Sequence, residues 1–171
     1  MNLKLSIRDV PDFPKPGIMF KDITPLLSNG AAFAHAIDTI AAHFEGEKID
    51  AVLGAEARGF ILGAALAYKL GCGFIPARKP GKLPHVVTQA VYELEYGTDT
   101  LEIHEDSILP GARVLIADDV LATGGTAGAK AELVKNAGGE VVGLAFLIEL
   151  KFLGGRDKLI DHDIFSLITY D

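Results

Sequence analysis

Residues 114–126 read VLIADDVLATGGT, and the interpretation of the rest of the chain depends on them. The first four residues form a short apolar run, typical of a strand that is buried on both faces of a sheet. Two aspartates follow, then a turn that contains two glycines. Apolar residues at positions 127, 131, 134 and 137 share one face of a predicted helix over Ala127 to Ala137.

The turn at residues 122–126, called here the glycine turn, has the composition of a phosphate site. Glycines allow positive φ, so backbone N–H groups can converge on an anion. The start of the following helix adds free N–H groups and the positive end of its dipole. Thr123 and Thr126 add hydroxyl donors. The simpler alternative is a surface turn after a core strand, but the order of chemical groups favours phosphate binding.

Asp118 and Asp119 precede the glycine turn and repel phosphate, but they can accept hydrogen bonds from ribose hydroxyls or from water around Mg²⁺. Binding groups for a phosphate, a diol and a metal ion, next to one another in the chain, suit a phosphorylated ribose as the ligand. Residues 114–126 therefore resemble the motif with which type I phosphoribosyltransferases bind 5-phosphoribosyl-1-pyrophosphate (PRPP).

Composition narrows the class of protein. The chain has 171 residues, of which 49% are hydrophobic and 23% charged, as expected for a single soluble domain. A net charge of −7 argues against general nucleic-acid binding. The single Cys72 excludes an internal disulfide and a cysteine-based zinc cluster. No apolar run reaches the ~18 residues of a membrane span and no signal region is recognisable, so we expect a cytoplasmic protein.

The first half of the chain predicts an N-terminal arm, two helices and two strands. Prolines concentrate between residues 10 and 27, which predicts a rigid wrapping arm over residues 1–30; the alternative is an arm that only packs its aromatic rings on the core. Apolar periodicity predicts helices from residue 33 to 44 and from 60 to 70, with Gly71 as the end of the second. Short apolar runs predict strands at 50–55 and 73–77.

Charged residues follow both of these strands. Arg58 comes shortly after the first strand, at the edge where open α/β sheets bind ligands, and its planar guanidinium suits phosphate oxygens. The alternative is a solvated arginine at a helix start. Arg78, Lys79 and Lys82 follow the second strand and indicate a polyanionic ligand.

The second half predicts an inserted hairpin and the end of the sheet. Strands over 88–96 and 100–105, joined at 97–99, predict a β-hairpin of low burial and a flexible lid over residues 79–106. A long strand at 140–150, a loop or short helix at 152–160 and a last strand at 164–169 follow. The alternation of strands and helices predicts one α/β domain over residues 1–171, with a mostly parallel sheet flanked by helices.

Four segments together resemble the adenine-specific branch of the type I phosphoribosyltransferase family, over nearly the full length of the chain. They are FPKPGIMFKDITP at 13–25, EARGF at 56–60, RKPGKLP at 78–84 with LEYG at 94–97, and the motif at 114–126. The resemblance implies the family fold, with the N-terminal arm as a hood over the base. It also implies a purine-salvage glycosyltransferase that converts adenine and PRPP to AMP and pyrophosphate, with Mg²⁺. A homodimer is expected, with neither nucleic acid nor membrane as a partner.

The resemblance also assigns roles to single residues. The 5′-phosphate is expected at Ala122, Thr123, Gly124, Gly125 and Thr126, and the ribose at Asp118 and Asp119. Pyrophosphate is expected at Arg58, which is also counted as catalytic, and at Lys79 and Lys82. Adenine is expected to stack on Phe20 and to be read by backbone groups of Met19 and Lys21. Glu95, as the catalytic acid or base, and Tyr96 are expected on the lid. Mg²⁺ is expected to be held by PRPP and water.

Two alternatives stay open at this point. A related phosphoribosyltransferase would use hypoxanthine, xanthine or orotate, which carry a carbonyl where adenine has an amino group. A regulatory PRPP sensor would share the fold without the reaction, but such regulators usually carry a DNA-binding module or a basic surface. Neither of these features is evident in the sequence.

Overall fold

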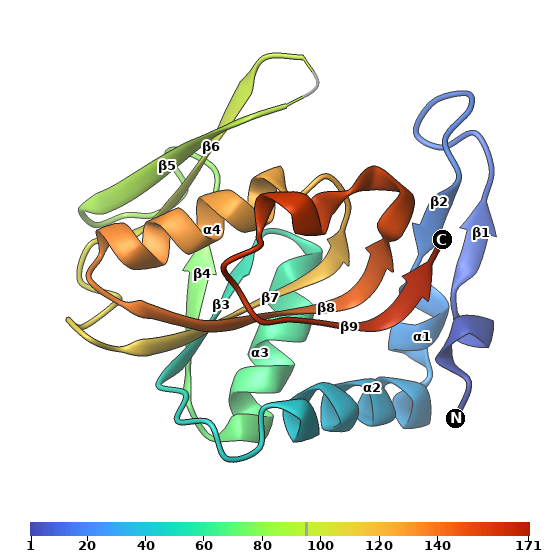
Figure 1. The fold of residues 1–171 in the computed structure, drawn as a ribbon, viewed down its shortest axis with the longest axis horizontal. Helices are drawn as coiled ribbons and strands as arrows, with labels where there is room; N and C mark the ends of the chain where they lie inside the picture. The colour runs from blue at the N-terminus through green and yellow to red at the C-terminus, as the bar shows by residue number, and fades with distance from the viewer. Residues whose placement is uncertain (95) are drawn as a thin grey trace.

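The computed structural model describes residues 1–94 and 96–171, and its centre is a five-stranded sheet (Figure 1). The strand order is β4-β3-β7-β8-β9, and every neighbouring pair is parallel. The strands are β4 (Gly73–Ala77), β3 (Ala51–Ala55), β7 (Arg113–Leu121), β8 (Glu140–Leu150) and β9 (Ile164–Tyr170). The predicted α/β fold with a parallel sheet is confirmed.

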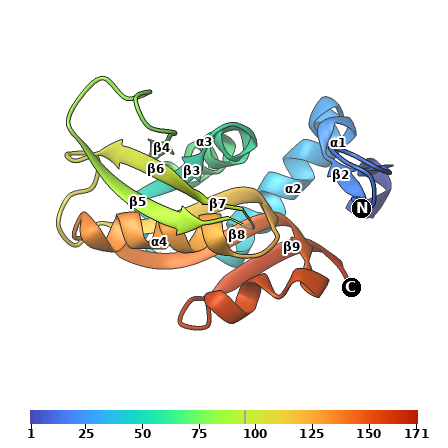
Figure 2. The same ribbon diagram turned by 90° about the horizontal axis from the view of Figure 1, so that it is seen from above.

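The helices cover both faces of the sheet (Figure 2). Helix α3 (Arg58–Leu70) connects β3 to β4, and α4 (Gly125–Asn136) connects β7 to β8 in the opposite direction along the sheet. Because crossover connections between parallel strands are right-handed, steps in opposite directions place the two helices on opposite faces. Helix α2 (Gly30–His43) lies with α3, and a buried apolar cluster fills each face.

The chain leaves the adjacent strands β3 and β7 in opposite directions, so the carboxyl ends of these strands form the switch point at which open α/β sheets bind ligands. In β7, all four residues of the predicted apolar run, 114–117, are fully buried. The strand continues to Leu121, in register with β8, instead of ending before the aspartates as predicted. Both carboxylates therefore project from the strand itself, one toward each face.

The N-terminal arm contains more regular structure than the prolines predicted. It consists of η1 (Leu3–Ser6), β1 (Arg8–Val10), β2 (Phe20–Asp22) and α1 (Thr24–Ser28). Strands β1 and β2 pair antiparallel. We call residues 8–22 the N-terminal ribbon. Strands of three residues are too short to show a periodic pattern in the sequence. They are recognised only by their pairing with each other in the structure.

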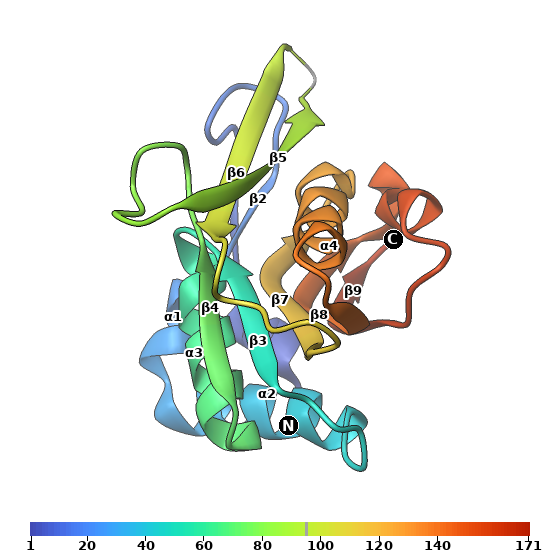
Figure 3. The same cartoon turned by 90° about the vertical axis from the view of Figure 1, so that its left-hand side faces the viewer.

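The predicted hairpin is present as β5 (Val87–Glu93) and β6 (Thr98–His104). The prediction of low burial is wrong for one of its faces. Ala90, Leu101 and Ile103 are at most 2% exposed, because this face packs against α4 and joins the core. The hairpin and the N-terminal ribbon rise on the same side of the molecule, beyond the carboxyl ends of the central strands (Figures 1 and 3).

The segment between β8 and β9 contains two short 3₁₀ helices, η2 (Lys151–Leu153) and η3 (Gly155–Lys158), as the expected loop or short helix. Gly71 ends α3 in the left-handed conformation, at φ +68°, which confirms its predicted role. In the parts of the chain that the structure describes, no helix has the length and apolar character needed to cross a bilayer.

Candidate active site

A cavity of about 480 Å³ lies at the carboxyl ends of β3 and β7. Its wall combines segments that are distant in sequence. Met19, Phe20 and Lys21 come from the N-terminal ribbon, Arg58 from the start of α3, Asp118 and Asp119 from β7, and Ala122 and Thr126 from the glycine turn. The structure therefore brings the residues expected for base, ribose and phosphate to one place.

The glycine turn encloses a second, smaller cavity of about 70 Å³, lined by Thr123, Gly124 and Gly125 among others. Gly124 has φ +84° and immediately precedes α4, which confirms the positive φ expected at this turn. A Cβ atom at Gly124 would lie 2.5 Å from the carbonyl oxygen of Gly155. Glycine is therefore required here both by the backbone conformation and by the close approach of η3.

Asp119 points toward α3 and pairs with Arg58, whose Nε donates to Oδ2 of the carboxylate. The Arg58 side chain is 50% exposed, whereas that of Asp119 is 10% exposed. Burial and the charge of Asp118 raise the pKa of Asp119 to about 6, and Arg58 acts in the opposite direction. This ion pair lies in the wall of the large cavity, where a ligand can reach it.

Asp118 points toward α4 and pairs with Lys130, a residue that the sequence interpretation missed. The Lys130 ammonium donates to Oδ2, and Oδ1 accepts the backbone N–H of Asp119 at 2.9 Å. Lys130 is 0% exposed. The signal for it was available, because position 130 is three residues after Ala127 and four before Val134, in the middle of the buried helix face.

Phe20 and Lys21 contribute different chemical groups to the cavity wall. The guanidinium of Arg58 lies 5.4 Å from the centroid of the Phe20 ring. The ammonium of Lys21 is engaged elsewhere: it donates to Oδ1 of Asp9 at 2.6 Å and lies 4.0 Å from the centroid of the Tyr170 ring. The side chain of Lys21 is therefore used to hold the ribbon, which leaves its backbone groups for the cavity.

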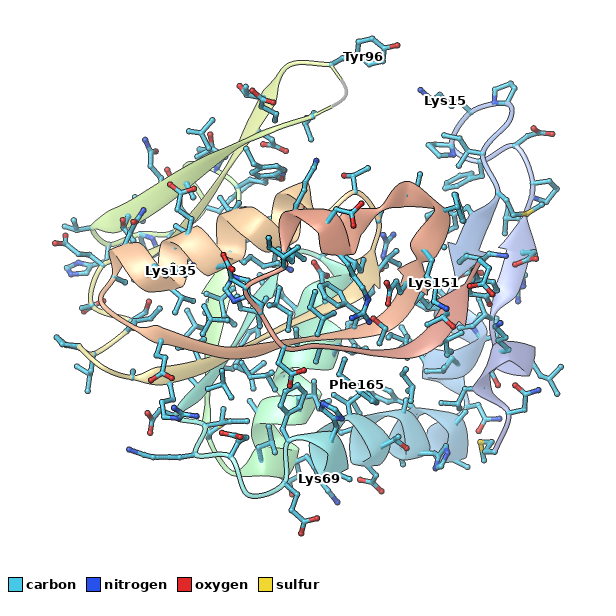
Figure 4. All side chains as sticks on the ribbon, viewed as in Figure 1. Lys15, Lys69, Tyr96, Lys135, Lys151 and Phe165 are labelled. Atoms are coloured by element: carbon cyan, nitrogen blue, oxygen red, sulfur yellow. The ribbon has the colours of Figure 1, made fainter. Side chains whose placement is uncertain are left out.

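The other expected cations and the lid residue lie outside the cavity wall. The ammonium of Lys79 donates to Asp99 and, at 3.3 Å, to the hydroxyl of Tyr92, so it is bound to the hairpin. Lys82 is exposed, and Tyr96 is 82% exposed at the end of the hairpin (Figure 4). Glu95 lies outside the described residues.

Glu56 is a second residue that was given no role in the sequence interpretation. Its Oε1 accepts the backbone N–H of Lys79 at 2.8 Å and Nε of Arg78 at 3.2 Å. It thus fixes the segment after β4 against the turn that carries Arg58. Within residues 1–94 and 96–171, no group of three or more His, Cys, Asp or Glu side chains is placed to hold a metal ion. Glu56 lines the large cavity together with Asp118 and Asp119. Since Glu56 is engaged with Arg78 and Lys79, the two aspartates are the carboxylates that could face a metal ion entering with a substrate.

The family model described as "Phosphoribosyl transferase domain" matches residues 22–169. The chain therefore belongs to the phosphoribosyl transferase family. The match begins at Asp22, the last residue of β2, and ends at Thr169 in β9, so it includes Arg58, both aspartates and the glycine turn.

Individual relatives and solved structures show which members of the family the chain is similar to. The adenine phosphoribosyltransferase of Geobacter metallireducens is 61% identical over 168 residues, which cover 98% of this chain and 98% of the relative. The crystal structure of adenine phosphoribosyltransferase from Thermoanaerobacter pseudethanolicus has a TM-score of 0.96 and 56% identity, and covers 98% of both chains. The enzyme from Saccharomyces cerevisiae, solved with D-2,5-dideoxy-2,5-imino-altritol 1,6-bisphosphate and adenine, has a TM-score of 0.93 and 44% identity, and covers 96% of both.

Proposed function

We propose that this protein transfers the 5-phosphoribosyl group of PRPP to adenine and releases AMP and pyrophosphate. The observation that carries the proposal is the large cavity, in whose wall the ribbon, the start of α3, the aspartates of β7 and the glycine turn meet. The relatives named adenine phosphoribosyltransferase, at up to 61% identity over nearly the whole chain, support adenine as the base.

Each part of the cavity suits one part of the substrates. The N–H groups of the glycine turn and of the first turn of α4 are donors for the 5′-phosphate. Asp118 and Asp119 accept the ribose hydroxyls. Phe20 provides a ring on which adenine stacks. Backbone N–H and C=O groups of Met19 and Lys21 match the acceptor N1 and the donor N6 of adenine.

The reaction replaces one bond at the anomeric carbon of the ribose by another. The bond to the pyrophosphate oxygen breaks with its electron pair, and N9 of adenine forms the new bond and gives up its proton. Such displacements pass through an oxocarbenium-like state. We propose that Arg58, helped by Lys79 and Lys82, stabilises the negative charge that develops on pyrophosphate. For this, Lys79 has to exchange Asp99 for the substrate.

Mg²⁺ enters this scheme as part of the substrate, bound to the oxygens of PRPP and to water, with Asp118 and Asp119 facing it.

We further propose that the hairpin closes over the site as a lid, with Tyr96 at its end. The active form is proposed to be a homodimer, in agreement with the exposed Ile61 and Tyr68 on α3. Because PRPP and AMP are highly charged and do not cross a bilayer unaided, we propose that the enzyme acts in the cytoplasm.

Glu95 is proposed to take the proton from the imidazole part of adenine. Glu95→Gln keeps the size of the side chain but cannot titrate, so kcat should fall by roughly 10²–10⁴. Glu93→Gln, which changes an exposed carboxylate at the end of β5, is the matched control and should retain turnover. Wild-type turnover in both variants would remove Glu95 from the mechanism.

The proposed function is tested by mixing the protein with PRPP, Mg²⁺ and one base at a time. We expect AMP from adenine and no nucleotide from hypoxanthine, xanthine or orotate. Nucleotide formation from another base in preference to adenine would overturn the specificity. Binding of PRPP without turnover of any of the four bases would mean that the protein is a PRPP sensor.

A further inference from the structure

Helix α4 carries a lysine in the interior of the protein. Lys130 is 0% exposed, whereas Lys135 on the same helix is exposed to solvent (Figure 4). Burial removes the hydration of an ammonium group at a large cost, so lysines are almost never fully buried unless they are paired. The partner of Lys130 is Asp118. A buried cation is therefore directed at one of the two carboxylates of the cavity.

The Asp118 carboxylate is fixed from several sides. Lys130 binds Oδ2, the backbone N–H of Asp119 binds Oδ1, and Gly59 leaves so little room that a Cβ there would lie 2.8 Å from Oδ1. The Asp118 side chain is still 14% exposed and lines both cavities. Lys130 is not among the described residues that line either cavity. Any effect of Lys130 on a ligand therefore passes through Asp118.

The charge of Lys130 also affects how an anionic substrate can bind beside Asp118. Asp118 and Asp119 together place two negative charges beside the position proposed for a polyanionic substrate. Arg58 balances one of them, but it is half exposed, and its charge is to be shared with pyrophosphate. Lys130 is fully buried and is not exposed to the substrate, so its pair with Asp118 can stay in place when PRPP binds. It is the counter-charge of the site that lies inside the fold.

We propose that Lys130 is a positioning residue for the transfer reaction. From inside the fold it holds the Asp118 carboxylate in the orientation that the ribose hydroxyls require, and its charge allows PRPP to bind beside that carboxylate. The inference rests on the proposed function and extends it to a residue that no substrate contacts.

The test compares Lys130→Met, which keeps the length of the side chain without its charge, with Lys135→Met on the exposed part of α4. Loss of a residue that supports a ligand-binding carboxylate should raise KM for PRPP by about 10- to 100-fold, the range found for groups that support metal ligands. KM for adenine should stay within about twofold of the parent value, and Lys135→Met should match the parent in both. An unchanged KM for PRPP in Lys130→Met, or an equal increase in both KM values, would overturn the inference.

A double-mutant cycle with Asp118→Asn separates positioning from mere stability. If Lys130 acts only through Asp118, the double variant should have the same kcat/KM for PRPP as Asp118→Asn alone. If the two losses multiply instead, the inference is wrong. The double variant removes both charges with little change of shape, so it decides the question even if Lys130→Met alone does not fold.

The inference can also be judged separately from the proposed function. If the parent protein makes no AMP from adenine and PRPP, the proposed function fails. The same cycle is then measured by calorimetry with PRPP as the probe. Non-additive losses in PRPP affinity support the coupling of Lys130 to Asp118, and additive losses, or PRPP that does not bind at all, overturn it.

Discussion

Two neighbouring carboxylates in this protein are paired with cations in opposite environments. Asp119 faces Arg58, which starts α3, is half exposed and also lies over the Phe20 ring. Asp118 faces Lys130, which lies in the middle of α4 on the other face of the sheet and is fully buried. Both arrangements follow from the alternation of side chains along β7 and from the helix on each side.

The difference in burial separates a replaceable contact from a fixed one. An exposed guanidinium can exchange a carboxylate for a substrate phosphate at low cost, because water compensates it during the exchange. A buried ammonium has no such intermediate, so it serves to hold its partner still. We therefore expect Arg58 to matter mainly for the reaction, and Lys130 for both the fold and the reaction.

The largest expected effect is on stability. Lys130→Met removes the fully buried partner of the Asp118 carboxylate and should lower the free energy of unfolding by about 3–5 kcal/mol. Arg58→Met breaks a pair whose guanidinium is half exposed and already screened by water, so it should cost less than Lys130→Met. Urea unfolding of both variants measures the two values. Equal losses would mean that burial does not distinguish the two pairs.

The next effect is on turnover. Arg58→Gln removes the guanidinium from the departing pyrophosphate, and kcat should fall by about 10²–10³, the usual cost of one group that stabilises developing negative charge. Arg58→Lys should recover only part of this loss, because an ammonium cannot bind phosphate oxygens in the bidentate manner of a guanidinium. Turnover near the parent value in Arg58→Gln would show that the pair with Asp119 is purely structural.

A smaller effect is expected at the ring beside Arg58. Phe20→Ala should weaken adenine binding by about 1–3 kcal/mol, the scale of base stacking on aromatic side chains, with KM for PRPP nearly unchanged. Phe13 contacts the edge of Phe20, with ring centroids 5.1 Å apart, and Phe13→Ala is the control for the packing of the ribbon. Equal changes in both KM values for Phe20→Ala would make Phe20 a packing residue.

The last effect concerns pH and develops gradually. The pKa of Asp119 is raised from 3.8 to about 6, so between these values the folded protein holds a proton that the unfolded chain has released. The contribution of Asp119 to stability is therefore full below about pH 4 and is lost as the pH rises to about 6, with a slope of at most about 1.4 kcal/mol per pH unit. Asp119→Asn should remove this slope, as measured by urea unfolding across that range. An identical slope in the variant would contradict the assignment.

The sequence predicted the parts of the site whose signals are local. The apolar run of β7, the glycine turn and the start of α4 follow one another in the chain, so their chemistry could be interpreted without the fold. Arg58 was expected at the correct edge, because parallel strands align their carboxyl ends. The positive φ of Gly124 was also expected, although its contact with Gly155 was not.

The features that were missed depend on contacts between distant segments. The hairpin was predicted to be of low burial because its alternation is weak. The burial of Ala90 and Leu101 depends on how the hairpin packs against α4 and the rest of the core. Lys79 was assigned to pyrophosphate, and its contact with Asp99 across the hairpin base has no trace in the local sequence. Lys130 was missed because one charged residue inside an otherwise apolar helical face is easily assigned to a solvated face.

The approach of Gly124 to Gly155 links two positions that carry no functional group. A Cβ at Gly124 would meet the Gly155 carbonyl oxygen at 2.5 Å, and a Cβ at Gly155 would meet the carbonyl oxygen of Ala122 at 2.4 Å. Neither backbone can give way without moving the glycine turn. In a survey of all single substitutions, Gly155 should thus tolerate as few other residues as Gly124. Sequence variation is therefore expected to be restricted at Gly155 as well, although it lies outside the glycine turn.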